Sequence, residues 1–242
     1  MTQRLLIVGA GGHGKVSAEV AMMMNYYREI VFLDDNVSCG STVLDLPVVG
    51  STAELVKLLR EDDGLFVAVG DNYKRRELLR RIRAQGLPVA TLCDPSAIVS
   101  HFATIAEGTL VMPRVVVNAG ARIGAGCILN TGAIVEHDCD VGNFAHLSPA
   151  VCIGGGVRVG DTAHLGLGAK VLPRLSIGSG TVVGAGSVVT RDLPSNVVAV
   201  GVPARIIRYA DSTIQPEYYR AGEARVSGGL VQAESLPRQQ AG

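Results

Sequence analysis

The chain has 242 residues and a mass of 25.2 kDa, which allows one large domain or two small ones. Its 22 basic and 22 acidic side chains cancel, so it lacks the cationic excess with which proteins neutralise nucleic-acid phosphates. Glycine and polar residues interrupt every long uncharged stretch, so no membrane insertion is predicted. Five cysteines without a CxxC pair, and an N-terminus without a cleavage pattern, favour a cytoplasmic protein with reduced thiols.

Residues 1–95 are predicted to form a small Rossmann-like α/β domain. The expected strands span 4–8, 30–33, 65–69 and 89–92, and the expected helices span 15–27, 52–61 and 73–85. Residues 9–14 read Gly-Ala-Gly-Gly-His-Gly, and backbone N–H groups in such a loop can approach a phosphate at a helix N-terminus. Asp34 follows Gly14 at the spacing of a ribose-binding acid in dinucleotide folds. The domain has room for one mononucleotide-binding half, which favours a nucleotide over NAD; a ligand-free turn remains the alternative.

From residue 98 onward, an aliphatic residue recurs at every sixth position. The sixteen positions from Val99 to Val189 are all Val, Ile or Leu, and a small side chain usually precedes each by two residues. Glycine or asparagine often follows directly, and both tolerate a positive φ angle. A period of six in a β-rich chain indicates a parallel β-helix with three hexads in each triangular coil. Residues 96–209 are therefore predicted to form about five coils, a prism about 25 Å tall.

The motifs at the end of the hexads narrow the interpretation. They are Val-Val-Gly-Ala-Gly-Ser-Val-Val-Thr at 182–190 and Val-Gly-Val-Pro-Ala-Arg at 200–205. Together with the N-terminal glycine-rich loop and Asn-Thr-Gly-Ala-Ile-Val-Glu-His-Asp at 130–138, they resemble the sugar O/N-acyltransferase family of hexapeptide-repeat, left-handed β-helix transferases. This family includes bacterial nucleotide-sugar 4-amino N-acetyltransferases and sialic acid O-acetyltransferases. The resemblance covers residues 4–208.

The resemblance implies a cytoplasmic homotrimer that transfers acetyl from acetyl-CoA to the amine of a UDP-, GDP- or dTDP-linked amino sugar. It implies direct attack on the thioester in a cleft between subunits, without a metal. Acetylation of a sialic acid or another sugar hydroxyl stays open, because a histidine base serves both reactions. A non-catalytic, nucleotide-binding trimeric scaffold and an NAD-linked function are the alternatives from other classes.

His137 is the candidate general base. It lies two positions past the inward Val135, at an exposed corner of the prism, and neutral imidazole can accept a proton at pH 7. The resemblance places the base here and its acidic partner at Asp138; a solvated corner histidine is the alternative. His146 precedes the inward Leu147, so it points outward from a face across the prism. The two histidines are therefore expected to meet only between neighbouring subunits.

The resemblance also assigns binding residues. The residues implied to contact the nucleotide-sugar are Gly11, Gly12, His13, Asp34, Asp35 and Gly70, and those implied to contact acetyl-CoA are His146, Gly155, Leu167 and Ala185. His164 stacks one coil above His146 and is expected to be a packed interface residue or to lie along the same cleft. Cys127 and Cys139 occupy small inward positions, which packing explains.

Two segments near the C-terminus carry weaker predictions. Basic residues within 201–208 are candidates for the CoA 3′-phosphate, and a solvated terminal turn explains them equally well. Residues 210–242 lose the hexads and are rich in polar residues, so they are expected to be disordered apart from a short helix near 215–224.

Overall fold

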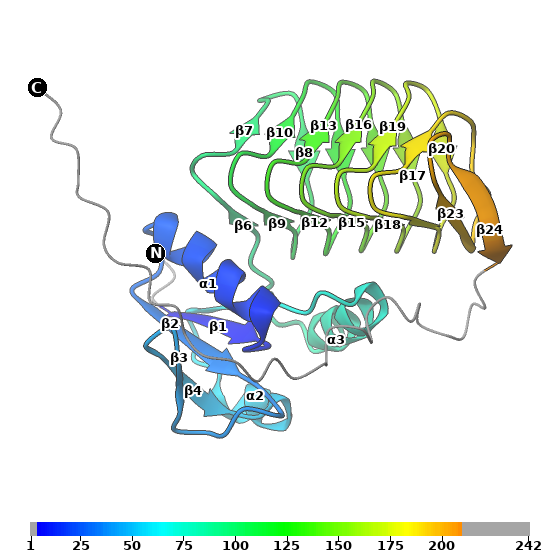
Figure 1. The fold of residues 1–242 in the computed structure, drawn as a ribbon. Coiled ribbons are helices and arrows are strands. Elements are labelled where there is room, and N and C mark those ends of the chain that lie inside the picture. The colour runs from blue at the N-terminus through cyan, green and yellow to red at the C-terminus, as the bar shows by residue number, and fades with distance from the viewer. Residues whose placement is uncertain (1–3, 210–242) are drawn as a thin grey trace, which may run out of the picture.

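The structure, a computed structural model, describes residues 4–209. An α/β domain is followed by a prism of short stacked strands, and helix α3 lies where the two parts meet (Figure 1). The predicted tail 210–242, with its short helix, lies outside the described residues. Among the residues that are described, no helix is long and apolar enough to cross a membrane.

The N-terminal domain is a five-stranded sheet between two layers of helix. The strand order is β3-β4-β2-β1-β5, with bounds β1 Arg4–Val8, β2 Glu29–Leu33, β3 Thr42–Val43, β4 Leu46–Gly50 and β5 Asp63–Val67. Successive side chains of a strand point to opposite faces. Leu5 and Ile7 therefore pack with α1 (Gly12–Met23), whereas Leu6 packs with α2 (Leu55–Leu58) and α3 (Asn72–Ala84).

The first helix begins earlier than predicted. It starts at Gly12 instead of residue 15 and ends at Met23 instead of residue 27. Gly14 lies so close to the first strand that a Cβ on it would stand 2.1 Å from the Gly9 carbonyl oxygen. The glycine is therefore required by the close packing of the helix on the sheet, whether or not a ligand binds.

Three other predicted elements differ from the structure. The helix expected at 52–61 is a short 3₁₀ turn, η1 (Thr52–Glu54), followed by α2, because Leu59 is already extended. The strand expected at 89–92 is divided: Val89 joins the α/β sheet by a single parallel bridge to Leu65, and Leu92 belongs to β6. The hairpin of β3 and β4 was not predicted, because its turn residues Leu44 and Asp45 adopt positive φ without a glycine or asparagine to signal it.

The β-helix follows the predicted period. Each of the sixteen aliphatic hexad residues is the second residue of one of the sixteen strands β7 to β22. The strands are β7 Ile98–Val99, β8 Thr104–Ile105, β9 Leu110–Val111, β10 Val116–Val117, β11 Arg122–Ile123, β12 Ile128–Leu129, β13 Ile134–Val135, β14 Asp140–Val141, β15 His146–Leu147, β16 Cys152–Ile153, β17 Arg158–Val159, β18 His164–Leu165, β19 Lys170–Val171, β20 Ser176–Ile177, β21 Val182–Val183 and β22 Val188–Val189.

Each strand pairs in parallel with the strand three steps later, which makes the three faces of the prism. We name these faces after their central strands: the β15 face, the β13 face and the β14 face. The β15 face has eight strands because it also contains β6 (Leu92–Cys93), β23 (Val197–Val200) and β24 (Arg205–Tyr209). Pairing along this face thus begins at Leu92, before the domain boundary predicted at residue 95.

Candidate active site

His137 and Asp138 form a hydrogen-bonded pair at a corner between β13 and β14. The His137 Nδ1 and the Asp138 Oδ2 are 2.8 Å apart, and both side chains are exposed. Asp138 has a φ of 58°, the left-handed conformation in which the chain turns at many corners of this prism. An ionised carboxylate only accepts hydrogen bonds, so Nδ1 carries the proton and Nε2 has a free lone pair. The pair thus has the chemistry of an oriented general base.

Gly155 lies one coil above His137 and packs against its ring. A Cβ at this position would stand 2.5 Å from His137 Nε2 and 2.6 Å from Cε1. The neighbouring Gly156 N–H donates to the His137 carbonyl over 2.9 Å. Gly155 was predicted to contact acetyl-CoA; the role that its geometry supports is to leave space for the imidazole ring.

His146 and His164 stack on the β15 face. Their ring centroids are 4.8 Å apart and the planes differ by 8°. The Asn130 amide lies 3.3 Å from His146 Nε2, and the Ser148 hydroxyl lies 2.9 Å from His164 Nε2. His146 is 8% exposed and His164 5%. His164 is therefore packed against its neighbours, and it also lines a cavity together with Ala185, so both of its predicted roles stay open.

The N-terminal domain covers these rings. His146 points outward from the prism as predicted, but the Gly70 backbone lies against it. The His146 Nδ1 is buried, and among the described residues no hydrogen bond to it meets the usual geometric criteria. In the single chain His146 is therefore covered, and its predicted contact with acetyl-CoA in a cleft between subunits stays a prediction. His13 approaches from the glycine-rich loop, and its Nε2 is likewise buried without a partner among residues 4–209.

Burial keeps this group of histidines neutral. Desolvation, followed by the nearby positive charge of Arg75, lowers the pKa of His13 to about 4 and that of His164 to about 4. Burial also lowers the pKa of His146 well below its ordinary value, with His164 as the next cause. Neutral imidazoles at this interface can donate and accept hydrogen bonds without adding charge.

The two histidine sites lie on different sides of the prism. His137 stands in the corner between β13 and β14, whereas His146 belongs to the eight-stranded face opposite that corner. The prediction that they do not meet within one chain agrees with this topology. A reaction that uses both therefore needs a second copy of the chain.

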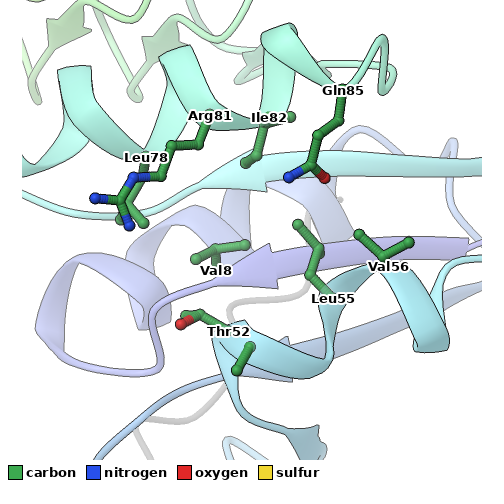
Figure 2. A pocket seen from close by; sticks show the side chains of 9 residues that line it. Val8, Thr52, Leu55, Val56, Leu78, Arg81, Ile82 and Gln85 are labelled. Atoms are coloured by element: carbon green, nitrogen blue, oxygen red, sulfur yellow. The ribbon is translucent and has the colours of Figure 1, made fainter.

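Two adjoining cavities lie at the carboxyl end of β1. Their volumes are about 340 and 460 Å³, and they share four lining residues, which are Val8, Thr52, Leu78 and Arg81. Figure 2 shows the smaller one, where Arg81 and Ile82 on α3, and Gln85 directly after it, face Leu55 and Val56 on α2. The larger cavity adds Asp34, Asp35, Lys74 and Glu77. Ligands of open α/β sheets bind at such a crevice beyond the carboxyl ends of the strands.

The predicted acidic residues are largely used by the protein itself. Asp34 accepts hydrogen bonds from the Ala10 N–H at 2.7 Å and from two backbone N–H groups of its own turn. These backbone bonds outweigh desolvation and lower the pKa of Asp34. Asp35 accepts from the backbone and hydroxyl of Thr52. Their carboxylates line the larger cavity, but their clearest role is to hold the glycine-rich loop and η1 in place.

Three glycines leave the approach to the loop open. A Cβ on Gly11, Gly12 or Gly70 would meet no atom within 4 Å. This free space agrees with a ligand that comes close to the backbone at these positions. The nucleotide-binding residues predicted in the loop and at Gly70 thus surround accessible backbone, with His13 behind them.

A third cavity, of about 320 Å³, lies on the β15 face, and His164 is one of its lining residues. Val182, Val183 and Val198 make it largely apolar, and Ala185 and Arg208 lie at its border. Leu167 lies one coil below Ala185 and is 52% exposed, and the two coils are joined by a hydrogen bond from the Gly186 N–H to the Leu167 carbonyl. Leu167 and Ala185 are therefore close together, whereas Gly155 stands at another corner with His137.

The cysteines occupy the places that their hexad positions predicted. Cys127 and Cys139 are buried inside the prism, and burial is the first cause that raises the pKa of both thiols, that of Cys127 to about 12. Such thiols stay protonated and are poor nucleophiles. Residues 4–209 contain no group of three or more His, Cys, Asp or Glu that could hold a metal ion.

Sequence reasoning missed the functional surface of α3. Lys74, Glu77 and Arg81 line the larger cavity, while Arg75 on the opposite side of the helix is 1% exposed. A signal for Arg75 was present, because positions 75, 79 and 82 share one helical face and the other two are Leu and Ile. A charged residue on an apolar face marks a buried polar contact.

Comparison with known proteins places the chain among sugar acetyltransferases. The profile of the PglD N-terminal domain matches residues 4–82. UDP-N-acetylbacillosamine N-acetyltransferase of Bacillus subtilis (strain 168) is 43% identical over 113 residues, which are 46% of this chain and 51% of that protein. The match therefore spans about half the length of this curated relative.

Two solved structures match over almost their full length. The acetyltransferase domain of PglB from Neisseria gonorrhoeae FA1090 is 40% identical, with a TM-score of 0.82 over 85% of this chain and 100% of that chain. PerB from Caulobacter crescentus, solved in complex with CoA and GDP-perosamine, is 43% identical, with a TM-score of 0.79 over 86% and 99%. These matches confirm the predicted family and its left-handed β-helix: the chain belongs to the hexapeptide-repeat sugar acyltransferases.

Proposed function

We propose that this chain is an acetyl-CoA-dependent N-acetyltransferase that acts on the amino group of a nucleotide-linked amino sugar. The observation that carries the proposal is the exposed His137–Asp138 pair, in a chain 43% identical over most of its length to a protein solved with CoA and GDP-perosamine. The cavities at the end of β1 support a nucleotide site, and the apolar cavity at Ala185 supports a site for the pantetheine arm.

In this proposal His137 removes the proton of the attacking amine. Asp138 holds the Nδ1 proton, so the Nε2 lone pair accepts the proton as the amine nitrogen bonds to the thioester carbonyl carbon. The carbon–sulfur bond then breaks, and the sulfur leaves as the thiolate of CoA. No thiol or hydroxyl of the chain is needed as a nucleophile, because the amine attacks the acetyl group directly.

Lys74 and Arg81 support the binding of a diphosphate at the nucleotide cavity. Both side chains line the larger cavity, which Gly9 of the glycine-rich loop also lines. Cationic side chains and free backbone N–H groups are the usual ligands of phosphate. Gly70 and His13 then lie between this cavity and the β15 face, on the side where the sugar would extend.

The assembly that we propose is a homotrimer, because each prism carries the base and the histidine face on different sides. The outward row of the β13 face supports a contact between copies, since it is mostly apolar. Its residues are Ile98, Val116, Ile134, Cys152, Lys170 and Val188. The outward row of the β14 face is polar instead, with Thr104, Arg122, Asp140, Arg158 and Ser176. All five cysteines are free thiols, which supports the cytoplasmic location included in this proposal.

The test is thiol release from acetyl-CoA against UDP-, GDP- and dTDP-linked 4-amino sugars and free and CMP-linked sialic acid. We expect turnover with one amino sugar, its loss in His137→Ala, and acetyl-CoA binding by calorimetry that survives in the variant. Equal activity of His137→Ala would overturn the assignment of the base. Turnover with sialic acid alone would replace the acceptor, and absence of acetyl-CoA binding would favour the scaffold.

A further inference from the structure

Helix α3 lies beside the β-helix, below the row of strands β12 to β18 in Figure 1, and its contacts follow one corner of the prism. Arg83 pairs with Glu107 over 2.6 Å, Leu79 packs over Gly108 and Gly126, and the Asn72 amide donates to the Thr162 carbonyl over 3.0 Å. The C-terminal end of α3 therefore contacts an early coil, at Glu107, and its N-terminal end contacts a later coil, at Thr162. Thirteen residues of α-helix are about 20 Å long, and strands stacked at about 4.8 Å place the span from Glu107 to Thr162 within that length.

Arg75 lies at the centre of this contact and joins the two domains. It is 1% exposed and is therefore one of the most buried side chains of the described chain. Its hydrogen bonds reach the carbonyls of Gly126 (2.7 Å) and Phe144 (2.9 Å) in the β-helix, the carbonyls of Val69 (2.9 Å) and Gly70 (3.1 Å) in the N-terminal domain, and the Asn72 Oδ1 (2.8 Å). The planar guanidinium suits this set because its five N–H groups have fixed directions.

Side chains at this contact decide at which height along the coils the helix lies. Backbone carbonyls recur at every coil, so they alone do not distinguish one height from the next. Side chains at this corner make the difference: a Cβ on Gly108 or Gly126 would stand 3.0 or 3.1 Å from Leu79, whereas Phe144 fills the next coil. Arg75 donates to a carbonyl in each of these two neighbouring coils, that of Gly126 and that of Phe144.

The other side of α3 lines the nucleotide cavities. Lys74, Glu77, Leu78 and Arg81 line the larger cavity, and each lies within two residues of a side chain that contacts the β-helix. Any shift of α3 along the prism therefore moves the nucleotide site relative to His146 and His164. The Val69–Gly70 turn moves with it, because Arg75 binds both of its carbonyls.

We propose that Arg75 is a positioning residue: it ties α3 to the β-helix in the register that Leu79 and Phe144 select, and so presents the bound nucleotide-sugar at the height of the His146 coil. This inference rests on the proposed function for its kinetic consequence. The geometric part, that Arg75 keeps the N-terminal domain seated over the histidine face, is measurable without activity. Arg75 touches no reacting atom in this proposal.

The experiment compares Arg75→Lys and Arg75→Met with Arg4→Met. Arg4 is a matched control because it is also buried, at 5% exposed, but it bonds to Asp63 and the Leu58 carbonyl inside the N-terminal domain. We expect Arg75→Met to lower kcat about 100-fold, as misplacement by about 1 Å does, with Arg75→Lys in between. The Kd values of GDP, UDP or dTDP and of acetyl-CoA, by calorimetry, should stay within about threefold, since neither site loses a contact.

The two Met variants are compared at an equal loss of Tm. If Arg75→Met then loses no more kcat than Arg4→Met does, the proposal is overturned. A second readout is the NMR titration of ¹³C-labelled His146 and His164 between pH 5 and 8. Arg75→Lys keeps the positive charge, so new titration in that variant reports uncovering of the rings, and its absence contradicts the positioning role. If the wild-type chain transfers acetyl to nothing in the panel, the proposed function fails, while this titration still decides the role of Arg75.

Discussion

The substitution Gly155→Ala tests the catalytic pair without touching either of its members. The new Cβ would stand 2.5 Å from His137 Nε2, well inside the 3.4 Å at which ordinary contact begins. The backbone itself accepts alanine, because Gly155 lacks the positive φ that marks its neighbour Gly156. The exposed imidazole is the movable partner, so it rotates away and loses its 2.8 Å hydrogen bond to Asp138.

The expected result is a loss of kcat with little loss of stability. A displaced general base costs between about 10²- and 10⁴-fold in rate, whereas a change at an exposed contact alters the free energy of unfolding by less than about 0.5 kcal/mol. The assay is steady-state thiol release from acetyl-CoA at saturating acceptor, together with a thermal melt of the same sample. Rotation of the ring also predicts that acetyl-CoA still binds.

Gly156→Ala is the matched control, because it should lower stability and leave the His137 ring in place. Gly156 has a φ of +68°, and the nearest atom to its added Cβ is 3.7 Å away. Alanine there costs about 1–2 kcal/mol of backbone strain but does not touch the ring. We expect lower Tm with kcat retained. Full kcat in Gly155→Ala, with an unchanged melt, would refute the reasoning that this ring in this orientation is the base.

The remaining predictions concern the acid partner, the assembly and pH. Asp138→Asn tolerates the left-handed corner but removes the carboxylate, so we expect kcat to fall with Tm unchanged; unaltered kcat would contradict a role for Asp138. Ile134→Glu puts a charge in the apolar row of the β13 face, and light scattering should report monomers; an intact trimer would contradict that interface. His13 and His164 have a pKa of about 4 when folded and 6.5 otherwise, so the unfolded chain binds more protons between these values. The free energy of unfolding, from urea titrations, should fall from pH 7 to pH 5 by up to about 1.4 kcal/mol per unit and histidine; a flat profile would contradict neutral burial.

Sequence periodicity predicted the β-helix in detail, for a local reason. Every strand must place an aliphatic side chain inside the prism, so a period of six shows in the sequence without reference to the other domain. Counting positions from the inward aliphatic residues placed His137 at a corner and His146 on a face. It also placed Cys127 and Cys139 in the interior, where the structure has them.

Boundaries in the N-terminal domain were harder to predict. The β3–β4 hairpin turns at Leu44 and Asp45 with positive φ, and neither residue marks such a turn in a sequence. The strand predicted near residue 89 pairs with the α/β sheet only at Val89, and its end contributes to the first rung of the β-helix through Leu92 and Cys93. Local pattern indicated an extended segment there but did not show which sheet it joins.

The sequence by itself determined the two architectures, the order of the hexads and the exposed corner position of His137 beside its acidic neighbour. Only the tertiary structure decided that the N-terminal domain covers His146, that Asp34 is used by the glycine-rich loop, and that Arg75 joins both domains. The physical reason is that a repeat records contacts made by every coil alike. The contact of α3 with Gly126 and Phe144 is made once, by Arg75 donating to backbone carbonyls that every residue possesses, so the sequence can mark Arg75 as a buried charge but not the carbonyls that accept from it.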